Sequence, residues 1–132
     1  MQGLERFSGP LLSVLRIISG LLYLEHGMTK LFTFPPTPMF PHPPEALSFF
    51  WFAGVLEFVG GILITLGLFT RPAAFILSGQ MAVAYFLVHA PHSFFPAVNQ
   101  GDAAILFCFI FLYFVAAGAG PWSLDAAFRK KS

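Results

Sequence analysis

Ionisable side chains interrupt the apolar runs of this sequence, where they are energetically costly. The run RIISGLLYLEHGMTK contains Arg16, Glu25, His26 and Lys30, and the run GVLEFVGG contains Glu57. A charged group in hydrocarbon costs about 3 kcal/mol on insertion scales, so it normally faces partners inside a helix bundle. Such groups can hydrogen-bond a polar ligand, and His26 suits proton transfer because imidazole exchanges a proton near neutral pH.

Helical spacing sorts these side chains onto faces. One stripe of the first run carries Arg16, Ser19, Gly20, Tyr23, Gly27 and Lys30. His26 flanks this stripe, and Glu25 points nearly the opposite way. With a rise of about 1.5 Å per residue, Glu57 lies close to the membrane midplane and the long side chain of Arg16 can climb toward it. We therefore predict that Arg16 and Glu57 pair, either as a structural contact or as part of a site.

Further polar residues lie between the third and fourth apolar runs. We expect the outer mouth of the bundle to gather His26, His89, His92, Asn99 and Asp102. The complete set of polar candidates for ligand binding is Arg16, Tyr23, Glu25, His26, Lys30, Glu57, Gln80, Tyr85, His89, Asn99 and Asp102. An alternative reading makes Lys30, His42 and His92 simple anchors in the headgroup region.

A metal site built from His26, His89, His92 and Asp102 is chemically conceivable, because imidazole and carboxylate suit zinc or iron. Pro91 lies between two of these histidines and breaks a helix, so their convergence is not expected. We assign no metal ligand and no catalytic residue.

The composition is that of a membrane protein. Of 132 residues, 57% are hydrophobic and 10% are charged, and 18 are Phe. A soluble domain of this size could not hide that apolar surface, so lipid must solvate it. The formal net charge of +1 argues against a nucleic-acid partner. The single Cys108 has no CxxC partner for dithiol chemistry, and the sequence carries no GxGxxG, haem or iron–sulfur motif.

Four apolar segments approach the roughly 20 residues that span a bilayer, at about 10–32, 48–69, 72–88 and 103–118. The sequence therefore predicts one all-α domain over residues 1–132, a polytopic four-helix membrane bundle. The proline-rich run PPTPMFPHPP must be a loop, and the link at Arg71 is short enough for a helical hairpin.

Basic residues are unevenly distributed between the expected loops. One side of the membrane carries Arg6, Arg71, Arg129, Lys130 and Lys131, whereas the opposite loops carry Lys30. Positively charged loops stay in the cytoplasm, so we predict that both termini are cytoplasmic in a bacterial inner membrane.

Four segments together resemble the DoxX family of small bacterial inner-membrane proteins: RIISGLLYLEHGMTKLF, LEFVGGILITLGLFTRPAAF, MAVAYFLVHAPHSFFPAVNQGD and FCFIFLYFVAAGAGPWSLD. The family pattern falls on Arg16, His26, Gly27, Lys30, Glu57, Arg71, His89, Asn99 and Asp102. Asp102 stands where Glu is more usual in the family. The resemblance implies a four-helix membrane bundle similar to the membrane subunit of a thiosulfate:quinone oxidoreductase, with relatives that assemble with redox enzymes.

Three functions are compatible with these residues. The first is an accessory subunit of a quinone-linked or oxidative-stress redox system, which would hold a quinone without catalysing alone. The second is a binding or assembly scaffold, or a chaperone, for which the stiff proline loop offers a docking edge. The third is a small-solute transporter, for which four short helices leave little room unless the chain forms a homo-oligomer.

Overall fold

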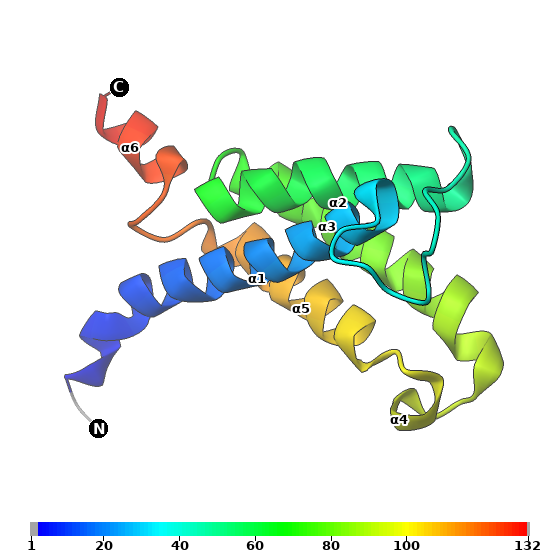
Figure 1. Ribbon diagram of the computed structural model, residues 1–132. Coiled ribbons are helices and arrows are strands. Elements are labelled where there is room, and N and C mark those ends of the chain that lie inside the picture. Colours follow the sequence, from blue (N-terminus) through cyan, green and yellow to red (C-terminus); the bar gives the residue numbers. More distant parts are fainter. Residues whose placement is uncertain (1–2, 132) are drawn as a thin grey trace.

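The computed structural model describes residues 3–131, together with the side chains of residues 3–129, and these residues form helices and loops without a strand (Figure 1). The α-helices are α1 (Ser8–Phe32), α2 (Phe49–Leu66), α3 (Thr70–Ala84), α4 (Pro96–Asn99), α5 (Asp102–Ala117) and α6 (Leu124–Lys131). The all-α prediction is confirmed for the described residues.

Among the residues that the structure describes, three helical segments are long and apolar enough to cross a membrane: Leu4–Phe32, Phe49–Leu66 and Thr70–His92. The fourth apolar helix, α5, has 16 residues, slightly fewer than the 17 or so at the short end of known spans. The count of four membrane-spanning helices therefore stays a prediction.

Helix α2 begins and ends at recognisable signals. Ser48 Oγ accepts a hydrogen bond from the backbone N–H of Trp51 at 3.3 Å, which caps the first turn. Gly67 ends the helix in the left-handed conformation, at φ 69°. The predicted helix to residue 69 was therefore too long, because this glycine turns the chain toward α3.

Helices α1 and α2 pack against each other over most of their length, and glycines let their backbones approach closely. A Cβ added at Gly27 would lie 2.5 Å from the backbone nitrogen of Phe58. A Cβ added at Gly61 would lie 2.7 Å from the Cα of Leu24. The two helices thus form one tightly joined pair, which fixes the polar stripe of α1 against α2.

The second helical pair is α3 with α5, and the core lies between the two pairs. Tyr23 of α1, Leu77 of α3 and Phe111 and Phe114 of α5 are buried there. The ring of Tyr23 meets the ring of Phe111 edge to face, with centroids 4.9 Å apart. This core holds the stripe of α1 in the interior of the bundle.

Helix α3 changes its winding where the sequence approaches Pro91. Residues Tyr85–His89 form a π-helical turn, η2, and Ala90–His92 form a 3₁₀ turn, η3. Proline cannot continue the α-helical hydrogen-bond pattern, so the predicted helix over 72–88 ends in a wider turn. That turn aims His89 at the loop that leads to α4.

The ends of the fold are arranged in two groups. Figure 1 shows the start of α1, the turn between α2 and α3, and α6 at one end, with the loop of residues 33–48 and α4 at the other. This grouping agrees with the predicted pairing of loops. Which end faces the cytoplasm stays a prediction, and the side chains of Lys130 and Lys131, used for it, lie outside the described part.

Candidate functional site

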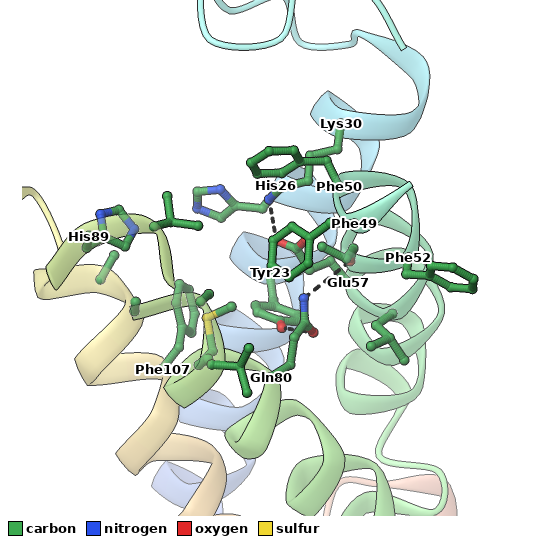
Figure 2. A pocket seen from close by; sticks show the side chains of 18 of the residues that line it. Tyr23, His26, Lys30, Phe49, Phe50, Phe52, Glu57, Gln80, His89 and Phe107 are labelled. Carbon is green, nitrogen blue, oxygen red and sulfur yellow. Dashed lines mark hydrogen bonds and ion pairs between the residues drawn. The ribbon is translucent and has the colours of Figure 1, made fainter. Parts of the chain in front are cut away.

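A cavity of about 530 Å³ opens among α1, α2, α3, α5 and the proline loop (Figure 2). Its walls are mainly apolar and aromatic, with contributions from Met39, Phe40, Phe49, Phe50, Phe52, Leu56, Ile76, Val83 and Phe107. Its polar lining residues are Tyr23, His26, Lys30, Glu57, Gln80, His89 and Gln100. An apolar pocket of this size with a few convergent polar groups is typical of a small-molecule site.

Lys30 and Glu57 form a buried ion pair at the head of this cavity. The Nζ atom of Lys30 lies 2.7 Å from Oε1 of Glu57, and the carboxylate side chain is 3% exposed. The second carboxylate oxygen, Oε2, has no hydrogen-bond partner of normal geometry among the described residues. A buried carboxylate oxygen without a donor is destabilising, so this atom is a ready point of attachment for a ligand.

The predicted pairing of Arg16 with Glu57 is wrong, because each residue has other partners. Arg16 Nε donates to the carbonyl of Ile64 at 2.9 Å, and its Nη2 donates to the carbonyl of Trp122 at 2.8 Å. Its Nη1 also donates to the carbonyl of Ala119. The last carbonyls of a helix lack intrahelical partners, so they attract a guanidinium with several donors. Arg16 therefore joins the end of α2 to the C-terminal segment.

Tyr23 and Gln80 form the floor of the polar region. The hydroxyl of Tyr23 donates to Oε1 of Gln80 at 2.5 Å, and Nε2 of Gln80 donates to the carbonyl of Ala53 at 3.3 Å. This chain of hydrogen bonds links α1, α3 and α2 beneath Glu57. The phenol proton is thereby committed to Gln80, while the phenol oxygen can still accept a hydrogen bond.

Two histidines line the cavity from different elements. Nδ1 of His89 lies 3.0 Å from the carbonyl oxygen of Asn99. A carbonyl only accepts, so Nδ1 carries the proton and Nε2 of a neutral ring is left as an acceptor. The ring of His26 meets Phe107 edge to face, with centroids 6.1 Å apart. Figure 2 shows both rings at the same side of the cavity, away from Phe52.

Asn99 and Tyr85 organise the loop beside the cavity. The side-chain amide of Asn99 donates to the Tyr85 hydroxyl at 3.2 Å and to the Ser93 carbonyl at 2.9 Å. Its Oδ1 accepts from the N–H of Gly101 at 2.8 Å. Asn99 is buried by these contacts, and it fixes the position of the His89 partner carbonyl. Asn99 and Tyr85 thus affect the site indirectly, by holding in place the loop that contacts His89.

The remaining sequence candidates lie outside the cavity. Glu25 is exposed on the far face of α1, as its helical position predicted, and it does not line the cavity. Asp102 is exposed in the first turn of α5. Within the described residues, no three His, Cys, Asp or Glu side chains converge as metal ligands.

Sequence reasoning missed residues that line the cavity, among them Met39, Phe40, Gly79 and Gln100. Met39 and Phe40 line it from the proline loop, and the ring of Phe40 lies 5.4 Å from Nζ of Lys30. Gly79 lines it from α3, where an added Cβ would meet no atom within 4 Å. The available signal was a glycine inside an apolar helical run. Glycine destabilises a helix relative to alanine, so its presence there indicates a place where the missing side chain leaves needed room.

The apolar lining of the cavity reaches the surface of the protein on α2 and α3. Its lining there includes Phe52 and Leu56 of α2 and Ile76 and Val83 of α3, and all four are exposed. Gly79 lies in the same wall of α3. Exposed apolar side chains of membrane helices face lipid, so a ligand with an apolar tail can reach this cavity from the bilayer.

The model of the DoxX family matches residues 11–90. The chain is 43% identical over 134 residues to an uncharacterized protein of Haemophilus influenzae, an alignment that covers 99% of this chain and 100% of that protein. It is 30% identical over 141 residues to an uncharacterized membrane protein of Mycobacterium tuberculosis, which covers 93% and 84% of the two chains. No solved structure matches the chain.

Proposed function

Because the chain belongs to the DoxX family of membrane proteins, we propose that it is the membrane-embedded accessory subunit of a quinone-linked redox system. In this role it binds the head group of an apolar electron carrier in the cavity and presents it to a partner enzyme. It works in the bacterial inner membrane with both termini in the cytoplasm.

This proposal is supported by one observation: the cavity has a polar end, and its apolar lining extends from there to the lipid-facing surface. The polar end holds the Lys30–Glu57 ion pair and the Tyr23–Gln80 hydrogen bond. The apolar lining reaches the surface through exposed apolar side chains of α2 and α3. A quinone matches both parts of the cavity. The carbonyls of its ring accept hydrogen bonds from polar side chains, and its isoprenoid tail remains in lipid.

The proposal assigns binding to this chain and electron supply to its partner. The sequence provides one cysteine, Cys108, and no motif for flavin, haem or an iron–sulfur cluster. We therefore expect quinone reduction only when a redox enzyme is assembled with this chain.

Photolabelling tests the binding step directly. An azido-quinone irradiated in membranes that contain the protein should label peptides of α2 and α3, and unlabelled quinone should compete for this labelling. At Gly79 an added Cβ meets no atom within 4 Å, so Gly79→Leu should place its side chain in the cavity and reduce labelling at least about fivefold. Phe75→Leu is the control, because Phe75 is 65% exposed on the same helix and does not line the cavity. Equal labelling of both variants would contradict the proposed site.

The accessory role is tested separately by enzyme activity. Membranes of a deletion strain should lose part of their quinone reduction, and wild-type protein should restore it while Glu57→Gln protein should not. Full restoration by Glu57→Gln would show that quinone reduction does not require the Lys30–Glu57 ion pair.

An exposed apolar surface favours a second candidate function, partner docking. It consists of the proline-loop residues Phe34, Met39 and Leu47 and of Phe94, Phe95 and Val98 near α4. Figure 1 places both segments at the same end of the fold. A scaffold would use this end to hold a protein partner, so crosslinkers placed in residues 33–48 should capture it in native membranes. Failure to capture any protein would count against docking.

A further inference from the structure

We infer that the cavity selects the reduced, hydroxyl-bearing form of an aromatic head group, with one hydroxyl donating a hydrogen bond to Oε2 of Glu57. This inference rests on the proposed function and deepens it, because it names the redox state of the ligand that the site holds. A quinone ring bears carbonyls that accept hydrogen bonds, whereas its reduced hydroquinone bears hydroxyls that donate them.

The free acceptor at the head of the cavity is the first reason. Oε1 of Glu57 receives Lys30 at 2.7 Å, while Oε2 has no partner of normal geometry among the residues that the structure describes. The side chain is 3% exposed, so bulk water has little access to this oxygen. A hydroxyl would satisfy Oε2, whereas a carbonyl oxygen would bring lone pairs against a carboxylate.

Two of the neighbouring donors, the Tyr23 hydroxyl and one N–H of the Gln80 amide, already have acceptors of their own. The phenol of Tyr23 donates to Gln80 at 2.5 Å, and the amide of Gln80 donates to the Ala53 carbonyl at 3.3 Å. His89 directs its Nδ1 proton to the Asn99 carbonyl, so its Nε2 adds a second acceptor to the lining. The lining therefore includes two acceptors for a ligand, Oε2 of Glu57 and Nε2 of His89.

The charge balance favours a neutral donor. Lys30 already compensates the charge of Glu57, so an ammonium group bound at Oε2 would leave an extra positive charge buried. A phenolic hydroxyl donates without adding charge. The lining rings of Phe40, Phe50 and Phe107 suit a flat aromatic head group, because aromatic pairs favour offset and edge-to-face contacts.

The apolar lining on α2 and α3 sets the ligand orientation. Phe52 and Leu56 on one side and Ile76 and Val83 on the other are both cavity-lining and exposed. Gly79 leaves the space beside it open. A ring held at Glu57 would direct its apolar tail along this lining into lipid, so the ligand class is a hydroquinone with an aliphatic tail.

Equilibrium binding under anaerobic conditions tests this selectivity. The probes are a ubiquinone with a short isoprenoid tail, its dithionite-reduced hydroquinone, and the dimethyl ether of that hydroquinone, which keeps the ring but has no donor. Wild-type protein in detergent should bind the hydroquinone at least about tenfold more tightly than the quinone, as expected for a hydrogen bond to a charged acceptor. The dimethyl ether should bind no better than the quinone.

The Glu57→Gln variant gives a second, directional readout. The carbonyl of the new amide should face Lys30, which places its NH₂ where Oε2 was and turns an acceptor into a donor. The preference for the hydroquinone should then disappear or reverse in favour of the quinone. Glu25→Gln is the matched control, because Glu25 is exposed and does not line the cavity.

The outcomes separate the two claims. If wild-type protein binds both redox forms equally, as when a water bridges Oε2, the selectivity is refuted and the proposed binding function stands. If it binds neither form, both claims fail. If the Glu57→Gln variant does not fold, the dimethyl ether comparison on wild-type protein still decides, since binding as tight as that of the hydroquinone would overturn the inference.

Discussion

Nζ of Lys30 lies 2.7 Å from Oε1 of Glu57, and this ion pair joins the last turn of α1 to the middle of α2. The contact lies inside the bundle, at the head of a cavity whose walls are mainly apolar. Buried ion pairs are costly to break from one side, because the remaining charge then has no partner. The pair therefore links the stability of the fold to the chemistry of the cavity.

Replacing one residue of this ion pair should lower the free energy of unfolding more than replacing both. We expect Lys30→Met to lower the free energy of unfolding by roughly 3 kcal/mol, because it leaves the carboxylate of Glu57 buried and uncompensated. The double variant Lys30→Met with Glu57→Gln should recover part of that loss. Thermal unfolding in detergent measures both, and additive effects of the two substitutions would show that the residues do not interact.

The role of Arg16 is predicted to be structural. Arg16→Lys removes the planar fork that reaches the carbonyls of Ile64 and Trp122, so stability should fall by at least about 2 kcal/mol. Trypsin should then cleave faster in α6, because the segment before it loses its attachment. Arg6→Lys is the control, since Arg6 is exposed. Unchanged proteolysis of the Arg16 variant would refute this role.

Glycines at the contact between α1 and α2 should not tolerate a methyl group. Gly27→Ala and Gly61→Ala each place a Cβ within 2.7 Å of the opposing backbone, so each should cost about 1–3 kcal/mol. Gly79→Ala should be neutral or slightly stabilising, because its Cβ meets open space and alanine favours a helix. Melting temperatures of the three variants provide the comparison, and an equal loss in all three would argue against close backbone packing.

The membrane orientation can be measured by fusion proteins. Alkaline phosphatase, which folds to its active form outside the cytoplasm, should be inactive at the C-terminus and active when inserted into residues 33–48. Green fluorescent protein at the C-terminus should be fluorescent. The opposite pattern would invert the predicted topology.

The sequence allowed a good prediction of the helices and of the buried face of α1. Ser19, Tyr23 and Gly27 of the predicted stripe are buried, and so is Arg16. This success has a simple cause: a helix in lipid must turn its small and polar residues inward, so helical spacing alone identifies the face.

The partners of the buried charges could not be predicted in the same way. The reach of Arg16 pointed to a side-chain partner, whereas its actual partners are backbone carbonyls, including those at the end of α2. Lys30 was placed on the inward stripe, with a headgroup anchor as the alternative, but its pairing with Glu57 and the ring of Phe40 beside it were not predicted. Loop paths depend on tertiary contacts that no local pattern encodes.

Helix α6 was also missed, because it is short and charged and gives no apolar run. Its local signal was present in the run GPWSLD: Ser123 Oγ accepts from the N–H of Ala126 at 3.1 Å, as a helix N-cap does. The carboxylate of Asp125 accepts from the N–H groups of Phe69 and Thr70 at 2.8 and 3.0 Å. That second contact joins α6 to the start of α3, and sequence spacing gives no hint of it.

Native mass spectrometry of the detergent-purified protein, combined with extraction of its bound lipids, tests the ligand cavity most directly. We predict that wild-type protein and Phe75→Leu carry a quinone or hydroquinone mass and that Gly79→Leu, once its melting temperature is shown to match that of the wild type, lacks it. A wild-type protein without such a mass, or a Gly79→Leu protein that keeps it, would contradict the account.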